Sequence, residues 1–437
     1  MLEKRVKTDM RNYYLTQSNG YITMRYKFFS NIYILCIDEG KKMKKRKIIF
    51  IIVPFLVVIF GVVAVSLYNS RSVTPAKFEK NINAIMQKSI SKNDNISGIQ
   101  ILVSYKNGYI DKSFVVGKKG GEILTVDNPF HSASIGKTFF STLIYILAER
   151  GELSLQNKIV DYFDPGFLDG LFVFEGIDYQ EDVTIEHLIT HMSGVADCFE
   201  GTVKEGQSMK ELVLSLPDKK WTQQELIDFS RFNQKAAGKP GEKFLYSDTG
   251  YALLGLIIED ITGKSFHKVL HEEIFEPLEM NDSYSMFYSR AKNQPQKSIA
   301  TIWFEGINVT DYNSMSVGLA DGGIVTTLSD LKIFIKALFN DKIISADSLS
   351  RMRTYNNEFI RGIHYGQGIM QLRFGEFFFL LKNMPTMEGH MGSIGTYMLY
   401  NPEKDICVIA NYGSSDYTEK SVNDLISVMR LLDRIKE

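Results

Sequence analysis

Strand-forming segments stand at the two ends of residues 77–437, and the stretch between them is patterned mainly for helices and loops. Strands are predicted at 98–117 (a hairpin with a Lys-Asn-Gly turn), 366–374, 377–381, 394–400 and 406–411. Helices are predicted at 77–92, from Ser134 to a cap at Gly151, at 330–339 and at 422–435. Strands that are far apart in the sequence must then pair in one sheet, which predicts an α+β fold with a helical insertion.

An uncharged, mainly apolar run over 48–68 follows a block of basic residues. The block comprises Lys41, Lys42, Lys44, Lys45, Arg46 and Lys47. The run is long enough to cross a bilayer core of about 30 Å, and positive charge stays on the cytoplasmic side. We therefore expect one transmembrane helix that contacts membrane lipid, a cytoplasmic N-terminus, and a C-terminal domain outside the cytoplasm at the cell membrane. A buried core helix is the alternative, but it leaves the basic block without a purpose.

The same pattern divides the chain. Residues 1–47 are expected to form a basic cytoplasmic tail, 48–68 the anchor, 69–76 a polar linker and 77–437 the folded domain. Residues 1–42 carry no motif, so Met43 is an alternative start. Ala64-Val65-Ser66 loosely fits a cleavage site, but the apolar run is long for a signal peptide, which favours a retained anchor.

Charge and cysteine usage exclude several classes of function. The formal net charge is -1, so nothing indicates nucleic acid as a partner. The 3 cysteines (Cys36, Cys198 and Cys407) form no CxxC pair, so neither a disulfide framework nor a cysteine-based zinc site is indicated.

Two histidine pairs have the i, i+4 spacing that can hold zinc. They are His187 with His191 and His267 with His271. Neither pair has the glutamate of an H-E-x-x-H motif, and no third ligand is evident. We therefore expect neither a metal nor another cofactor.

Ser134-Ile135-Gly136-Lys137 is an S-x-x-K motif at the start of a strongly apolar predicted helix. Residues i and i+3 share a helix face, so Lys137 is able to reach the hydroxyl of Ser134. A serine needs a base to become a nucleophile, and a lysine serves if its surroundings hold it neutral. Chance matches to the motif occur at Ser89, Ser265, Ser289 and Ser329. Only Ser134 opens an apolar helix directly after a strand-rich segment.

Two further segments have residues suited to catalysis or binding. Tyr246-Ser247-Asp248 lies between loop-like stretches, and a tyrosine there relays a proton if its pKa is lowered. A packed aromatic residue is the simpler interpretation of Tyr246 alone. Gly389-His390-Met391-Gly392 precedes a predicted strand, and its glycines allow a substrate backbone to approach closely. A lone histidine is more often structural.

The order of these segments resembles the serine beta-lactamase and penicillin-binding protein superfamily, in the branch with class C beta-lactamases, D-Ala-D-Ala carboxypeptidases and related esterases. Further similar segments are Leu188–Gly194, Pro240–Gly255, Ile274–Met280 and Gly318–Leu331. The resemblance covers about residue 77 to the C-terminus. It implies an antiparallel sheet flanked by helices and a mainly helical second domain.

The resemblance also implies roles for the site residues. Ser134 would be acylated, Lys137 would act as its base or keep Tyr246 deprotonated, and Tyr246 would relay the proton to the leaving group. His390 would stand where many relatives have the lysine of KTG. The backbone N–H groups of Ser134 and of Ser393, the residue after Gly392, would form the oxyanion hole, at about 3 kcal/mol each.

Asp248 departs from the family pattern, in which an asparagine donates to the acylamide carbonyl of the substrate. A carboxylate has no hydrogen to donate, which puts recognition of penicillin-like amides in doubt. We expect a serine hydrolase that acts on a cell-wall peptide or a related D-amino-acid amide or ester. Beta-lactam-like substrates and the oligomeric state stay open. The alternative is a catalytically weak protein with a binding, sensing or wall-shaping role.

Overall fold

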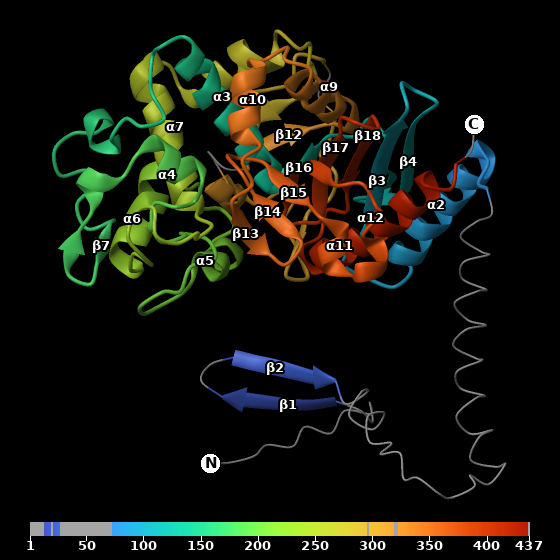
Figure 1. Ribbon diagram of the computed structural model, residues 1–437, viewed down its shortest axis with the longest axis horizontal. Helices are drawn as coiled ribbons and strands as arrows, with labels where there is room; N and C mark the ends of the chain where they lie inside the picture. The colour runs from blue at the N-terminus through green and yellow to red at the C-terminus, as the bar shows by residue number, and fades with distance from the viewer. Residues whose placement is uncertain (1–12, 19–20, 27–71, 295–296, 319–321, 436–437) are drawn as a thin grey trace, which may run out of the picture. The chain divides into compact units, whose positions relative to one another are not determined.

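The computed structural model describes residues 13–18, 21–26, 72–294, 297–318 and 322–435 (Figure 1). The chain divides into two compact units, Met1–Arg71 and Ser72–Glu437. In the first unit the described residues form one antiparallel hairpin, β1 (Tyr13–Ser18) with β2 (Tyr21–Tyr26).

The predicted fold class is wrong in one respect, the preceding transmembrane helix. No helix among the residues that the structure describes is long and apolar enough to cross a membrane. A spanning helix takes about 20 residues, whereas the longest described helix, α2 (Pro75–Ile90), has 16 and buries only one face. Residues 48–68, on which the prediction rested, lie outside the described residues. The location of the domain outside the cytoplasm stays a prediction.

A nine-stranded antiparallel sheet is the frame of the second unit, and its order confirms that strands from both ends of this unit pair. In spatial order the strands are β13 (Asn357–Ile360), β14 (Ile363–Tyr365), β15 (Met370–Leu372), β16 (Met387–Gly392), β17 (Thr396–Asn401), β18 (Ile406–Asn411), β3 (Gly98–Tyr105), β4 (Ile110–Lys119) and β5 (Glu122–Ile123). The hairpin predicted at 98–117 is β3–β4, and the strand predicted at 406–411 is β18.

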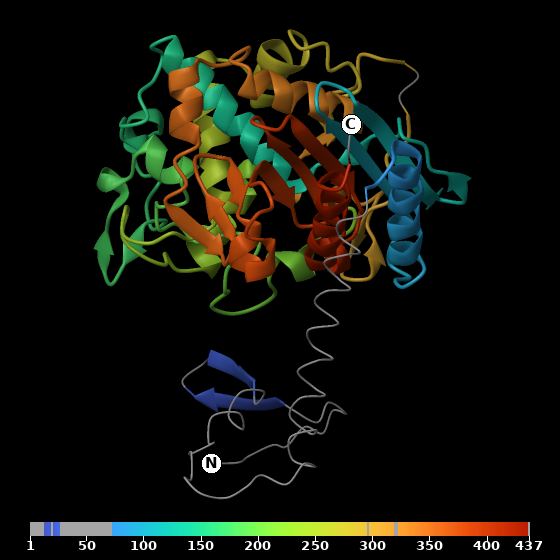
Figure 2. The same ribbon diagram turned by 45° about the vertical axis from the view of Figure 1, so that its right-hand side comes forward.

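Helices cover both faces of this sheet because successive strand residues point to opposite sides. Along β18, Val408 packs in a core with α2 and α12 (Thr418–Leu432), whereas Ile409 packs in the core that contains α3 (Gly136–Glu149) and α9 (Leu328–Phe339). Figures 1 and 2 show α2 in blue and α12 in dark red together on one face of the sheet.

A mainly helical region lies between β5 and β13 in the chain and also holds small two- and three-stranded sheets. Its other α-helices are α4 (Ile185–Ile189), α5 (Met209–Ser215), α6 (Gln223–Asn233), α7 (Asp248–Thr262), α8 (Phe266–Leu270) and α10 (Ala346–Met352). Its short strands are β6 (Phe130–His131), β7 (Val173–Phe174), β8 (Ile177–Asp178), β9 (Tyr284–Ser285), β10 (Trp303–Phe304), β11 (Ile307–Asn308) and β12 (Ile324–Thr326).

Single-turn helices complete the second unit. They are η1 (Ala133–Ile135), η2 (Ile159–Tyr162), η3 (Gln180–Asp182), η4 (His271–Phe275), η5 (Asn313–Gly318), η6 (Phe379–Leu381), η7 (Ser415–Tyr417) and the short α11 (Phe374–Phe377). Two of the predicted strands, at 366–374 and 377–381, differ from the structure. Only Met370–Leu372 of the strand predicted at 366–374 is β15, and 377–381 is mainly helical with Phe379 and Leu380 exposed. An apolar run without a sheet neighbour has no ladder to join.

Strand β16 lies directly against the turn that carries Ser134, and Gly392 makes this approach possible. A methyl group at Gly392 would lie 2.7 Å from the Cβ of Ala133 and 2.8 Å from the carbonyl oxygen of Ser132. The hydroxyl of Thr396, on the next strand, donates to the same Ser132 oxygen at 2.8 Å. The sheet therefore fixes the position of the turn.

We predict that Gly392→Ala lowers the free energy of unfolding by about 2 kcal/mol, because the added methyl overpacks the contact with Ala133. Gly250→Ala is the matched control. A methyl at Gly250 would meet its nearest neighbour, the Leu188 carbonyl oxygen, at an ordinary 3.7 Å, so this variant should be as stable as the wild type or slightly more stable. Thermal unfolding measures both. Equal melting of Gly392→Ala and the wild type would contradict the close approach.

Candidate active site

Ser134 lies in η1, on a strained turn between β6 and α3. The preceding residue, Ala133, has φ of 50°, which is uncommon for a residue with a side chain. The backbone before it is held at both ends, because the N–H of Ser132 donates to Ile324 and the N–H of Ala133 donates to the His131 ring at 3.2 Å. Such strain persists only where the surroundings enforce it, and it is typical of functional sites.

Lys137 lies on α3, one helical turn after Ser134, and its side chain has no exposed surface. Its ammonium donates to Ser134 Oγ at 3.3 Å and lies 2.7 Å from Asp248 Oδ1. The ammonium also lies 4.8 Å from the centre of the Tyr246 ring. Burial of a charged ammonium lowers the stability of the fold by several kcal/mol unless the charge is paired. The contact with Asp248 therefore allows Lys137 to lie here as a cation.

The other four S-x-x-K serines have different surroundings. Within the described chain, only the hydroxyl of Ser134 among the five has a hydrogen bond to the side chain of its own lysine. Ser89 donates to Asp424 at 2.6 Å, and Ser289 accepts the N–H of Ser285 at 2.8 Å. Ser265 precedes α8, and Ser329 shares a hydrogen bond with Thr327. The structure thus separates one serine from four that match the same pattern.

Tyr246 comes from a separate loop and meets the Ser134–Lys137 pair. Burial raises the pKa of Tyr246 above its usual range, while the charge of Lys137 and hydrogen bonds with Ser134 and Lys137 act in the opposite direction. The phenol is therefore protonated at neutral pH. His191 supports the loop: its ring lies 4.2 Å from that of Tyr246, and its Nδ1 accepts the N–H of Ser247 at 3.1 Å.

Asp248 is the first residue of α7 and sits beside a second carboxyl group. Its N–H donates to Asp197 Oδ1 at 3.0 Å, and Asp197 is almost fully buried. Burial and the charge of Asp248 raise the pKa of Asp197. The two carboxyl groups thus lie beside one paired lysine.

His390, on β16, is fully buried rather than exposed to a substrate. Its Nδ1 lies 2.8 Å from the Met391 carbonyl oxygen. A carbonyl only accepts, so Nδ1 carries the proton and Nε2 is the acceptor. Burial and the charge of Lys137 lower the pKa of His390 to about 3, so the ring is neutral. His390 is close enough to Lys137 to feel its charge, but it adds no positive charge.

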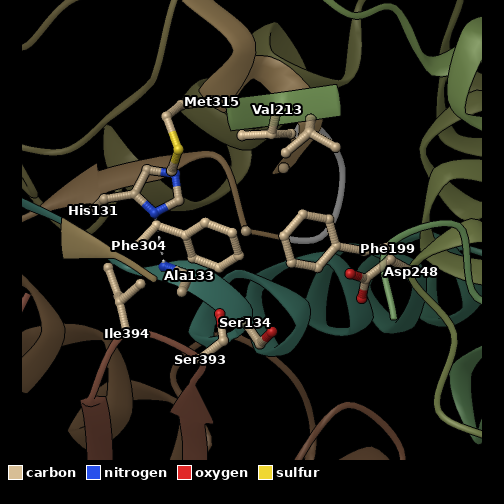
Figure 3. Close-up of a pocket in the computed structure, with 13 residues that line it drawn as sticks. His131, Ala133, Ser134, Phe199, Val213, Asp248, Phe304, Met315, Ser393 and Ile394 are labelled. Carbon is tan, nitrogen blue, oxygen red and sulfur yellow. Dashed lines mark hydrogen bonds between the residues drawn. The ribbon is translucent and has the colours of Figure 1, made fainter. Parts of the chain in front are cut away.

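A cavity of about 60 Å³ opens beside the nucleophile. Its lining is mainly apolar and comprises His131, Ala133, Ser134, Phe199, Val213, Asp248, Phe304, Met315, Val317, Gly318, Gly322, Ser393 and Ile394. Figure 3 shows Ser134 and Ser393 next to each other, the rings of Phe199 and Phe304 across from them, and Asp248 on the side of Phe199. Ser134 and Ser393 therefore face the same space, as their predicted oxyanion-hole role requires. That role stays a prediction.

Two residues near the site, His131 and Asp197, were not singled out by the sequence analysis, and a third, His191, was considered there only as part of a possible zinc pair. Burial lowers the pKa of His131 to about 4, so this cavity residue is neutral. The sequence held a weak indication of Asp197 and His191, because His191 lies in the family-like segment 188–194 and Asp197 lies three residues after it. His187 belongs to the capping box of α4, so the two histidines of that pair have separate structural roles. The described residues contain no cluster of three or more potential metal ligands.

We predict that His390 makes stability depend on pH. Its folded pKa lies below the unfolded value of about 6.5, so its contribution to stability is present above pH 6.5 and is lost as the pH falls toward 3. Replacing it by glutamine should reduce the slope of unfolding free energy against pH by up to about 1.4 kcal/mol per unit.

Denaturant unfolding at pH 6.5, 5.5 and 4.5 provides the measurement. Asp197 and Asp330 have raised pKa values and contribute the opposite slope, so the comparison is the difference between His390→Gln and the wild type. Parallel curves for the two proteins would show that His390 does not titrate in this way.

Comparison with known proteins supports the assignment that the geometry indicates. The sequence model of the family described as Beta-lactamase matches residues 78–429. Penicillin-binding protein 4* of Bacillus subtilis (strain 168) is 31% identical over 265 residues, which is 56% of this chain and 52% of that protein. The chain thus spans about half the length of this relative.

Solved structures share the fold. A D-amino acid amidase from Ochrobactrum anthropi SV3 aligns with a TM-score of 0.64 and 24% identity, over 81% of this chain and 100% of that one. An octameric penicillin-binding protein homologue from Pyrococcus abyssi aligns with a TM-score of 0.63 and 27% identity, over 80% of this chain and 77% of that one. The resemblance found in the sequence is confirmed: the chain belongs to the Beta-lactamase family, in the penicillin-binding protein and beta-lactamase superfamily.

Proposed function

We propose that the protein hydrolyses an amide or ester through an acyl-enzyme on Ser134. The proposal rests on one observation: the side chains of Ser134, Lys137 and Tyr246 contact one another. Lys137 Nζ lies 3.3 Å from Ser134 Oγ, and Tyr246 has hydrogen bonds with both residues. An activated serine needs a base within hydrogen-bond reach and an acid for the leaving group. Both are supplied here from different elements, α3 and the loop before α7.

The proton path follows from the charges at the site. The buried Lys137 ammonium must first lose a proton to Asp248 or to solvent, after which its amine accepts the proton of Ser134 as Oγ attacks the carbonyl carbon. Tyr246, which burial keeps protonated, donates its proton to the leaving nitrogen or oxygen. Lys137 then returns the serine proton to Tyr246. In deacylation the neutral amine of Lys137 takes a proton from the attacking water and gives it to Ser134 Oγ as the acyl–oxygen bond breaks, which releases the acid. Lys137 then regains its first proton from Asp248 or solvent, and the site has its starting protonation.

We propose a cell-wall peptide or a related D-amino-acid amide or ester as the substrate. The apolar lining, with Phe199, Phe304 and Val213, suits an apolar acyl part. A D-amino acid amidase has the same fold, which shows that the fold is compatible with such chemistry. The departure at Asp248 argues against fast turnover of penicillins, as the sequence indicated.

We predict that Ser134→Ala abolishes covalent labelling by a fluorophosphonate, because among the S-x-x-K serines of the described chain only the Ser134 hydroxyl is hydrogen-bonded to the side chain of its lysine. Lys137→Ala and Tyr246→Phe should each slow labelling by about a hundredfold or more, as expected for loss of general acid–base catalysis. The double variant should be little slower than either single variant, because groups on one proton path give non-additive losses. Intact-mass spectrometry follows the labelling.

Ser329→Ala is the matched control and should label at the wild-type rate. This serine has the same S-x-x-K spacing, but its hydroxyl shares a hydrogen bond with Thr327, and its lysine, Lys332, pairs with Asp111. Labelling of folded Ser134→Ala at the wild-type rate would refute the proposed nucleophile. Losses that multiply in the double variant would refute only the shared proton path.

We also propose that the domain acts outside the cytoplasm. The support is in the sequence, where the basic block at 41–47 precedes the apolar run at 48–68, a pattern typical of export. Protease added to intact cells should therefore degrade the domain, with a cytoplasmic protein as the control. Digestion only after lysis would contradict the proposal.

A further inference from the structure

Asp248 is the charged residue of the cavity beside Ser134. Among the described residues that line this cavity there is no lysine or arginine, and the pKa of its one histidine, His131, is lowered by burial. The side chain of Asp248 is 16% exposed, whereas its partner Lys137 has no exposed surface. A ligand in the cavity therefore meets the carboxylate of the ion pair and not its ammonium.

The position of Asp248 relative to the nucleophile limits which ligand group it can bind. The Lys137 ammonium contacts both Ser134 Oγ and Asp248 Oδ1, so a single cationic group separates the carboxylate from the attacking oxygen. In an amino-acid amide or ester the α-nitrogen is two bonds from the carbonyl carbon that Ser134 attacks. An α-ammonium group can therefore reach Asp248 while the carbonyl carbon lies at Ser134.

A carboxylate can accept hydrogen bonds at both of its oxygens. The contact with Lys137 involves Oδ1, so Oδ2 is able to receive a second cation. Asp197 lies next to Asp248, and burial and the charge of Asp248 raise the pKa of Asp197 to about 8, so it is mainly protonated at neutral pH. The carboxylate of Asp248 is then the negative charge that an arriving ammonium meets. A neutral N-acyl amide offers no positive charge, and its carbonyl oxygen would face the carboxylate.

We propose that Asp248 binds the α-ammonium group of the substrate, so that the enzyme selects unblocked amino-acid amides or esters over N-acylated peptides and penicillins. This inference rests on the proposed function, because it concerns the acyl part attached to Ser134. Binding of an ammonium at Asp248 also weakens the hold of the carboxylate on the Lys137 proton. That proton then leaves to solvent, and the amine becomes available as the base for Ser134.

The test compares D-phenylalanine 4-nitroanilide with its N-acetyl derivative, using the ratio of the two kcat/KM values. The wild type should prefer the unblocked compound by at least tenfold, which is about 1.4 kcal/mol. Asp248→Asn should reduce the ratio to about one or invert it, because the amide side chain lacks the charge and is able to donate to the acetyl oxygen. A ratio cancels any general change in rate that the loss of the Lys137 partner causes.

Glu200→Gln is the matched control for charge. Glu200 is exposed, lies outside the cavity lining and pairs with Lys210, while its N–H donates to Asp197 at 3.0 Å. Its neutralisation removes one nearby negative charge without touching the cavity and should leave the ratio unchanged. Should turnover be too slow to measure, protection of Ser134 from fluorophosphonate by each compound gives the ratio of the two dissociation constants, and the same preference is expected there.

The outcomes separate the two proposals. A wild type that labels at Ser134 but treats both compounds alike, or prefers the N-acetyl one, overturns the role of Asp248 and leaves the serine hydrolase intact. The same conclusion follows if Asp248→Asn keeps the wild-type preference. Absence of labelling at Ser134 overturns the proposed function and the inference with it.

Discussion

The buried contact between the Lys137 ammonium and the Asp248 carboxylate is the interaction on which the arrangement of the site depends. A lysine without exposed surface cannot stay charged without a partner, and removal of one member of such a pair costs about 3–5 kcal/mol. Lys137 belongs to α3 and Asp248 to α7, so the pair forms only when these two helices pack. Their apolar faces share one core. The ion pair then holds Nζ at the position where it contacts Ser134.

The sheet supplies the other wall of the site and is itself tied down near the same place. On β16, the buried Glu388 accepts two hydrogen bonds from Arg353, at 2.7 and 2.8 Å, and one from Tyr355 at 2.5 Å. Two residues further along the same strand is His390, and four residues further is Gly392, which packs against the Ser134 turn. A strand fixed at one end by a buried charge pair and at the other by close packing holds the nucleophile between two rigid elements.

Asp248 takes part in two contacts, one with the catalytic lysine and one with the cavity. Its Oδ1 pairs with the Lys137 ammonium, and its side chain also lines the cavity that we propose receives the substrate. Asparagine, the residue that the family pattern usually has here, would present a donor and no charge. The exchange of an amide for a carboxylate thus changes both the charge of the group that pairs with the lysine and the charge that a substrate meets. His390 adds no compensating cation, because burial and Lys137 keep it neutral.

Local patterns in the sequence were sufficient for much of this description. The apolar spacing of α3 and α9, the β3–β4 hairpin and the i, i+3 spacing of Ser134 and Lys137 all depend on neighbours within one or two turns. The resemblance in the order of the motifs indicated the family and brought Tyr246 and Asp248 into the site. The same local reasoning failed at 377–381, where an apolar run looks like a strand but has no partner strand.

Only the tertiary structure decided which of five S-x-x-K serines has a base, that Asp248 pairs with Lys137, and that His390 is buried and neutral. The last two facts join Lys137 to residues that are 111 and 253 positions further along the sequence. Their distances, burial and charges depend on how α3, α7 and β16 pack together. The spacing of residues in the sequence does not predict that packing. The free energy of a buried charge depends on its surroundings, and these form only when the whole chain folds.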